Sequence, residues 1–114
     1  MDYLKSEPCK KKINAIDDAM YVIGGKWKMH LVTALYFGEK RYSELLESID
    51  GISGKMLSRV LKEMEINLLI KRDVSNTRPV TVTYELTEYA KELFPVIDML
   101  AKWGTRHRNQ IKSQ

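Results

Sequence analysis

The sequence has a single cysteine, Cys9, and no apolar run long enough to serve as a leader or a membrane span. One cysteine excludes a disulfide framework within the chain, so we expect a reducing, cytoplasmic setting. The first residues lack the apolar stretch of a secretion signal, and no window approaches the roughly 18 apolar residues that cross a bilayer. Neither export nor a membrane partner is therefore expected.

The motifs that carry catalysis or hold a metal are also missing. Gly24-Gly25-Lys26 has neither the preceding strand nor the spacing of a phosphate loop. His30 and His107 lie far apart, and one cysteine adds too little to make a cluster of metal ligands. We therefore expect no catalytic residue, no metal and no cofactor.

What the chain does have is a mild excess of positive charge on a sequence able to fold. Its 114 residues include 19 Lys and Arg against 15 Asp and Glu, and 44% are hydrophobic. This composition excludes a disordered polycation and fits one small folded domain. The net charge of +4 favours an anionic partner without identifying it.

Apolar residues at helical spacing predict that the first part of the chain is helical. Four helices are expected, over residues 13–23, 26–38, 42–49 and 53–67. Ser53 is a good N-cap for the fourth, and Ile52 and Leu57 occupy the two positions of a hydrophobic staple. A short helix, a tight turn and a longer helix form the plan of a helix-turn-helix.

The spacing of apolar residues changes after the fourth helix. Alternation over residues 80–86 predicts a half-buried strand, with residues 70–74 as its antiparallel partner across a polar turn. Thr87 then caps a last helix, which we expect Pro95 to bend. The predicted fold class is therefore α+β and mostly helical, with a helix-turn-helix, a basic hairpin and an additional helix at each end.

The fourth predicted helix has an apolar face and a cationic face. Helical projection gathers five residues as core: Leu57, Val60, Leu61, Met64 and Leu68. Lys55, Arg59 and Lys62 lie on the opposite face, and no acidic residue occurs from position 51 to position 62. On an isolated helix such cations would most simply form a solvated surface. In the second helix of a helix-turn-helix, which meets base edges in the major groove, they favour contact with DNA.

The expected contacts follow from side-chain chemistry. Arg59 can bind a guanine bidentately, and Arg78 in the hairpin adds a further cation. Side chains suited to phosphates or single base contacts surround Arg59: Ser53, Lys55, Ser58 and Lys62. Gly54 leaves room for close approach of the backbone, or is simply tolerated at the first helical position.

Several motifs in register resemble those of the HxlR-type winged-helix transcriptional regulators. They are Cys9, Ile23-Gly24-Gly25-Lys26-Trp27-Lys28, Arg41-Tyr42-Ser43-Glu44-Leu45, Gly51-Ile52-Ser53-Gly54-Lys55-Met56-Leu57, Tyr84-Glu85-Leu86-Thr87 and Trp103-Gly104. The resemblance implies a MarR-like dimer whose first and last helices form the interface. It implies DNA contacts by Ser53, Lys55, Met56, Ser58, Arg59 and Lys62 on the helix and by Thr77 and Arg78 in the wing. Where the family usually closes this helix with Asn/Asp-Gly, the chain has Asn67-Leu68, so Asn67 is expected in the left-handed position.

The residues themselves also indicate a homodimer, because the first and last helices carry more apolar surface than one small core needs. The expected interface comprises Ile13, Ile16, Met20, Leu93, Ile97, Leu100 and Trp103. Packing across a two-fold axis would place two recognition helices roughly 34 Å apart, which is one turn of DNA. The alternative is that Trp103 packs inside its own subunit.

We expect an N-terminal arm over residues 1–12, a winged domain over 13–108 and a basic tail over 109–114. Cys9 lies in that arm beside lysines, which favour the reactive thiolate, and the resemblance makes it a candidate redox sensor of an electrophile or oxidant. The alternative is a small buried hydrophobe. Together, the helix-turn-helix, the cationic face and the expected dimer indicate a sequence-specific regulator that binds double-stranded DNA at a pseudo-palindromic operator. The other hypothesis is that the chain is a winged helix with a protein-interaction or architectural role.

Overall fold

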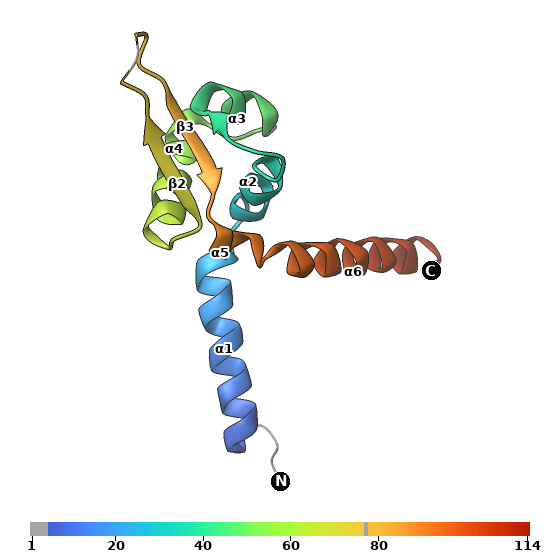
Figure 1. Cartoon of the computed structure of the whole chain (residues 1–114). Coiled ribbons are helices and arrows are strands. Elements are labelled where there is room, and N and C mark those ends of the chain that lie inside the picture. The colour runs from blue at the N-terminus through green and yellow to red at the C-terminus, as the bar shows by residue number, and fades with distance from the viewer. Residues whose placement is uncertain (1–4, 77) are drawn as a thin grey trace.

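The structure, a computed structural model, describes residues 5–76 and 78–114 and combines a winged unit with two projecting helices (Figure 1). In chain order the elements are α1 (Glu7–Ile23), α2 (Lys28–Ala34), β1 (Lys40–Arg41), α3 (Tyr42–Ser48), α4 (Gly54–Ile66), β2 (Ile70–Val74), β3 (Val82–Leu86), α5 (Glu88–Lys91) and α6 (Phe94–Lys112). The predicted fold class, α+β and mostly helical with a helix-turn-helix and hairpin, is confirmed.

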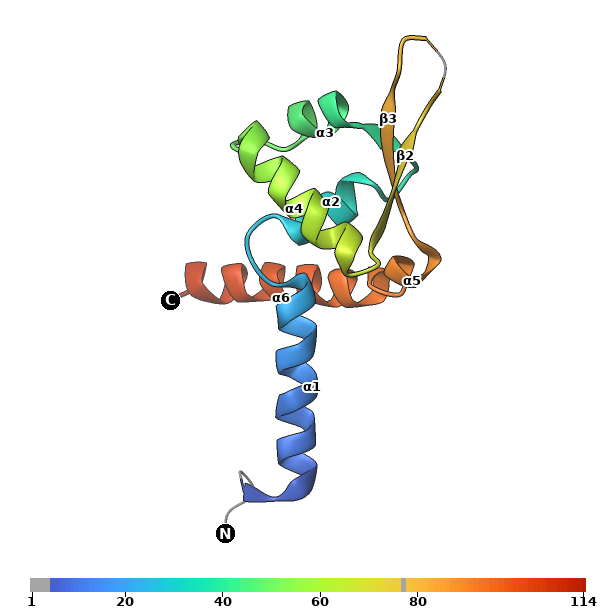
Figure 2. The same cartoon turned by 90° about the vertical axis from the view of Figure 1, so that its left-hand side faces the viewer.

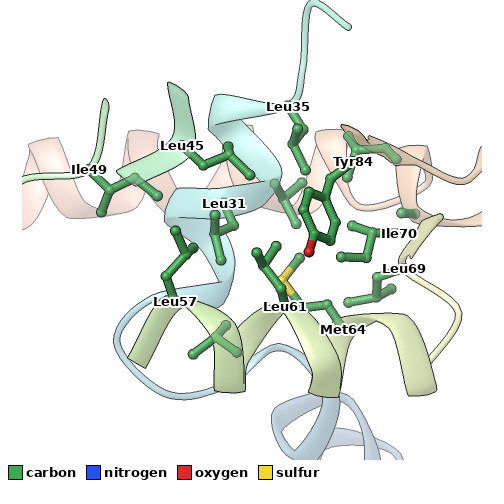
Figure 3. Packing of buried hydrophobic residues seen from close by; sticks show 14 of the residues in the cluster. Leu31, Leu35, Leu45, Ile49, Leu57, Leu61, Met64, Leu69, Ile70 and Tyr84 are labelled. Carbon is green, nitrogen blue, oxygen red and sulfur yellow. The ribbon is translucent and has the colours of Figure 1, made fainter. Parts of the chain in front are cut away.

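The core lies between α2, α3, α4 and the sheet, and its side chains converge from all four (Figure 3). Leu31 of α2, Leu45 of α3 and Leu57 of α4 are fully buried within it. Met64 and Leu69 close the end of this cluster beside the sheet. The apolar face predicted for α4 is thus the face that joins the helix-turn-helix to the rest of the winged unit.

The sheet has three antiparallel strands in the order β1-β3-β2. The hairpin register pairs Ile70 with Leu86 and Arg72 with Tyr84. β1 pairs Lys40 with Tyr84, and its two residues were too few to show an alternating pattern in the sequence. This third strand attaches the start of α3 to the hairpin, so the helix-turn-helix and the wing are held in one unit.

The first helix begins earlier than predicted. Ser6 caps α1 by accepting a hydrogen bond from the Cys9 backbone N–H at 3.3 Å, and Pro8 occupies the first turn, where no backbone donor is lost. Residues 7–12 of the expected arm over 1–12 are therefore helical. Cys9 lies inside α1 instead of ahead of it.

The last helix is two helices. α5 ends at Lys91, and Pro95 stands in the first turn of α6, where proline is well tolerated, so the chain breaks before Pro95 and is not bent by it. α6 continues to Lys112 and takes up most of the tail expected over 109–114.

The end of α4 also differs from the expectation. Asn67 caps the helix with a φ of −88°, and Leu68 takes the left-handed conformation with a φ of 65°. Because the helix ends at Ile66, the helical projection no longer applies at Leu68, whose side chain is 66% exposed. The adjacent Leu69 is the residue that enters the core.

Candidate nucleic-acid interface

α4 is fixed at its N-terminus by the residues that the sequence indicated. Ser53 accepts a hydrogen bond from the Met56 backbone N–H at 3.1 Å, which satisfies one of the free donors of the first turn. Ile52 and Leu57 are both buried in the core on either side of this cap. The start of the second helix is therefore rigidly placed, and its side chains point to defined positions.

A hydrogen-bonded brace joins α3 to α4. The Tyr42 hydroxyl donates to the Gly54 carbonyl at 2.8 Å and lies 3.1 Å from the Ser58 hydroxyl. Tyrosine has one hydroxyl proton, so Ser58 is the donor in the second bond. Ser58 has thus committed its proton inside the protein, and its predicted phosphate contact would require that bond to break.

The same brace accounts for Gly54. A Cβ added at this position would lie 3.2 Å from the Tyr42 hydroxyl oxygen, closer than most such contacts. The glycine is therefore explained by the approach of Tyr42, without any need for close approach of DNA.

The start of α3 is fixed by a carboxylate. Glu44 accepts a hydrogen bond from the Arg41 backbone N–H at 2.9 Å. This bond, with a smaller contribution from the hydrogen bond and charge of the Arg41 side chain, holds the pKa of the Glu44 carboxyl below its ordinary value. Arg41 also belongs to β1, so a single residue connects the sheet to the helix-turn-helix.

Lys55, Arg59 and Lys62 are all exposed on α4, as predicted, and we call them the cationic stripe. The stripe is not free of acid, because Arg59 Nε lies 3.5 Å from an oxygen of Glu63, one turn further on. The second oxygen of Glu63 lies 3.5 Å from Lys28 Nζ. Arg59 is 71% exposed, so this pair is weak and leaves the guanidinium accessible to a ligand.

The other residues predicted to contact DNA differ in how exposed they are. Met56 is half-buried and packs against the core, so little of its side chain faces outward. Arg78 is exposed in the turn of the hairpin. Thr77 lies outside the described residues.

The side chains predicted for the dimer interface form two groups. Leu93 and Ile97 are half-buried and pack against the core of their own subunit. The rest are exposed along α1 and α6: Ile13, Ile16, Met20, Leu100 and Trp103. Trp103 is 59% exposed and stacks on His107 with ring centroids 5.0 Å apart, so the alternative that it packs inside its own subunit is wrong.

Cys9 is less accessible than the sequence suggested. It is 5% exposed, and the expectation of an accessible residue ahead of the first helix is wrong. The nearest lysine in sequence, Lys10, lies 3.8 Å from Glu7 in an exposed ion pair. The Cys9 thiol is therefore shielded from solvent in this structure.

Comparison with known proteins identifies the family. The protein-family model described as HxlR-like helix-turn-helix matches residues 22–112 of the chain. The chain belongs to the HxlR family. It is 43% identical over 103 residues, which cover 90% of the chain, to the HTH-type transcriptional regulator YtcD of Bacillus subtilis, 82% of which is covered. This membership makes the chain a transcriptional regulator of the helix-turn-helix type, not an enzyme.

Solved structures of a redox regulator and of a MarR-family regulator share the fold. The redox regulator HypR in its reduced form matches with a TM-score of 0.80 and 32% identity over 88% of this chain and 99% of HypR. Its oxidised form matches with a TM-score of 0.76 and 33% identity over 81% of this chain and 95% of HypR. A MarR-family regulator from Enterococcus faecalis V583 matches over 100% of both chains with a TM-score of 0.80 and 31% identity. No helix in the described part of this HxlR-family chain is long and apolar enough to cross a membrane.

One feature of the surface was not predicted. Arg72 of β2 is exposed beside α4, on the same side of the sheet as the core residues Ile70 and Leu86. Strand alternation could have indicated this side, because Arg72 is two residues from Ile70.

Proposed function

We propose that this HxlR-family regulator binds double-stranded DNA in a sequence-specific manner through α4 and the hairpin. The observation that carries the proposal is the cationic stripe, which stands exposed on the second helix of a rigidly braced helix-turn-helix. The opposite face of the same helix is buried, so the stripe is the face that α4 presents to a partner. Arg78 extends the positive surface into the hairpin.

Within this proposal the side chains have different tasks. Arg59 reads a guanine, because a guanidinium matches the two acceptors of that base in the major groove. Lys55 and Lys62 neutralise phosphates, and Ser53, Ser58, Met56 and Thr77 complete the contact set. Ser58 and Met56 contribute less, since one donates its proton to Tyr42 and the other is half-buried.

The proposed binding unit is a homodimer on a pseudo-palindromic operator. Exposed apolar side chains at Ile13, Ile16 and Met20 on α1 and at Leu100 and Trp103 on α6 support it, because helices with such faces are unfavourable in water. A two-fold axis through these helices would give each half-site its own recognition helix. Because the proposed partner is chromosomal DNA, we also propose that the regulator acts in the cytoplasm.

Arg59→Ala tests the DNA-binding proposal. The DNA is the region upstream of the chain's own gene, compared with a scrambled duplex at two salt concentrations in a gel shift. We expect the variant to bind the upstream region about tenfold or more weakly and to lose discrimination between the duplexes, as for a lost bidentate base contact.

The matched control is Lys91→Ala, which removes one positive charge on α5, at the end of the winged unit away from the hairpin turn (Figures 1 and 2). It should bind like the unaltered protein. Equal binding and equal discrimination by Arg59→Ala and Lys91→Ala would contradict the assignment of Arg59. An unaltered protein that discriminates no sequence would instead favour the protein-interaction or architectural role.

We further propose that modification of the Cys9 thiol by an oxidant or electrophile switches DNA binding. Support comes from the fold shared with HypR, a redox regulator solved in reduced and oxidised forms. Because Cys9 is buried at the first turn of α1, its reaction requires that turn to open, and the modified thiol would then disturb a helix of the proposed dimer interface.

Treatment with diamide tests the thiol switch. The affinity of the unaltered protein for its operator should change on treatment, and Cys9→Ser should show no change. An equal response in both proteins would dismiss the switch while leaving the DNA-binding proposal intact.

A further inference from the structure

A polar pocket of about 460 Å³ lies between α4 and the sheet. The cartoon shows that α4 and the hairpin diverge from the turn that joins them (Figure 2). We call this pocket the seam pocket. Its lining consists of Ser58, Leu61, Lys62, Glu65, Arg72 and Tyr84. Only Lys62 among these belongs to the cationic stripe, so the pocket is a distinct feature at the edge of the stripe.

Two cations meet at the seam pocket. Arg72 pairs with Tyr84 in the hairpin register and lies on the side of the sheet that faces α4, whereas its neighbour Lys71 lies on the other side and pairs with Glu85 at 3.4 Å. Within the described residues neither Arg72 nor Lys62 forms an ion pair. Two like charges that line one pocket without partners repel each other, and an anion between them would relieve that repulsion.

The hydroxyl of Tyr84 adds an uncharged donor to the pocket. Tyr84 is only 9% exposed, and its hydroxyl is directed toward α4 near Leu61 (Figure 3). It makes no hydrogen bond in the part of the chain that the structure describes, where no buried side-chain N or O atom lacks a partner, so this hydroxyl opens onto the pocket and is free to donate. Ser58 offers the pocket an acceptor only, since its proton goes to Tyr42. The available donors are therefore Lys62, Arg72 and Tyr84, and the Glu65 carboxylate is the opposing charge.

We propose that the seam pocket holds a phosphate of the DNA backbone, bound by Lys62 and Arg72 with the Tyr84 hydroxyl as a third donor. This proposal rests on the proposed function, because it requires α4 to lie in the major groove. The sugar-phosphate strand that borders that groove must then pass between α4 and the hairpin, which is where the seam pocket opens. A phosphate held from both elements would set how deeply α4 enters the groove, and thus the position of Arg59.

The test compares Arg72→Ala with Lys71→Ala, because the two remove the same charge at adjacent positions on opposite sides of one strand. Binding of fluorescent duplexes, operator and scrambled, is measured by anisotropy over a range of salt concentrations. For Arg72→Ala we expect roughly tenfold weaker binding to both duplexes, as for loss of a charged hydrogen bond. The slope of log affinity against log salt should fall by about 0.9, as for one phosphate contact.

Lys71→Ala should remain within about twofold of the unaltered protein in affinity, because its pair with Glu85 is exposed and weak. Glu65→Gln should tighten binding to both duplexes about twofold, because a carboxylate that faces the phosphate is removed. Residues 65, 71 and 72 are all exposed, so these three variants should keep the fold, which circular dichroism verifies.

The outcomes separate the two proposals. If the unaltered protein discriminates the operator but Arg72→Ala and Lys71→Ala have equal slopes, the seam pocket holds no DNA phosphate while the proposed function stands. If Arg72→Ala loses affinity equally on both duplexes but the unaltered protein shows no discrimination, the pocket assignment stands and sequence-specific function fails. Absence of any DNA binding overturns both. Saturable binding of pyrophosphate in calorimetry, lost in Arg72→Ala while the DNA slopes stay unchanged, would show a site for a free phosphate compound and also overturn the assignment.

Discussion

The winged unit and the two terminal helices place their apolar side chains in opposite ways. In the winged unit, α2, α3, α4 and the sheet direct leucines and aromatic rings into one shared core. In α1 and α6, most of the large apolar residues face solvent, and α6 has no buried residue at all. The winged unit can therefore hold its own fold, whereas the terminal helices leave an apolar surface uncovered within the chain.

This contrast assigns separate tasks to the two regions. The unit that presents the cationic stripe is braced from within by Ser53 and Tyr42, and its geometry does not depend on a partner. The helices that carry Trp103 and Cys9 leave apolar side chains exposed, and in our proposal a second chain covers them. A signal acting on α1 could thus change the distance between two rigid DNA-binding units without changing either unit.

The largest expected effect is in the core. Leu31→Ala should lower the free energy of unfolding by about 2–5 kcal/mol, because Leu31 is fully buried and the cavity cannot be refilled. Urea denaturation followed by circular dichroism measures it. The matched variant Ile16→Ala, on the exposed face of α1, should lose less, and its loss should depend on protein concentration. Equal, concentration-independent losses would contradict the proposal that α1 is stabilised by a second chain while the winged unit is not.

Next in size is the effect of Trp103→Ala on assembly. A tryptophan that becomes buried in an interface commonly contributes about 2 kcal/mol or more to binding. We therefore expect the dissociation constant of the Trp103→Ala dimer to be roughly thirtyfold higher than that of the unaltered dimer. Sedimentation equilibrium gives the dissociation constant directly. Lys102→Ala, the neighbouring exposed residue of α6, should leave that constant unchanged. A monomeric unaltered protein at micromolar concentration would contradict the dimer.

A smaller effect is expected from Tyr42→Phe in the brace. The variant loses the hydrogen bonds to Gly54 and Ser58 and should be destabilised by about 1 kcal/mol in thermal unfolding. Ser58→Ala removes only one of these bonds and should lose less. Both losses should be independent of protein concentration, since the brace lies inside one winged unit; a concentration-dependent loss would mean that the unit is completed by its partner.

The smallest effect concerns Glu44. The pKa of Glu44 is lower in the folded chain than in the unfolded one. The carboxylate therefore stabilises the fold at a pH above the unfolded pKa, and this contribution is lost as the pH falls through the folded pKa. Glu44→Gln should therefore lower the melting temperature slightly at neutral pH and not at acidic pH. Glu47→Gln on the same helix is the control, and a melting difference that stays constant across that pH range would contradict the role of the carboxylate.

The repeating patterns of the sequence predicted the helix-turn-helix, the hairpin and the two exposed terminal helices, because periodicity of 3.6 or 2 is a local property. What escaped prediction depends on single residues or on distant ones. The two-residue strand β1 has no period, and the brace joins Tyr42 to Ser58, 16 positions away. Leu68 took the left-handed conformation that asparagine usually prefers, and the burial of Cys9 is not visible in its polar sequence neighbours.

The part of the candidate site that lies on one helix was predictable, because helical periodicity is a local property of the sequence. Lys55, Arg59 and Lys62 follow from one helical projection, but the pairing of Arg59 with Glu63 required the geometry of the next turn. Arg72 joins the surface only because the hairpin folds back beside α4.

We propose that two self-supporting winged units, joined through α1 and α6, read one operator. Hydroxyl-radical footprinting of the unaltered protein on the DNA upstream of its own gene tests this most directly. We expect two protected tracts related by two-fold symmetry, with centres about ten base pairs, or a multiple of one helical turn, apart. A single protected tract, or uniform weak protection along the whole duplex, would contradict it.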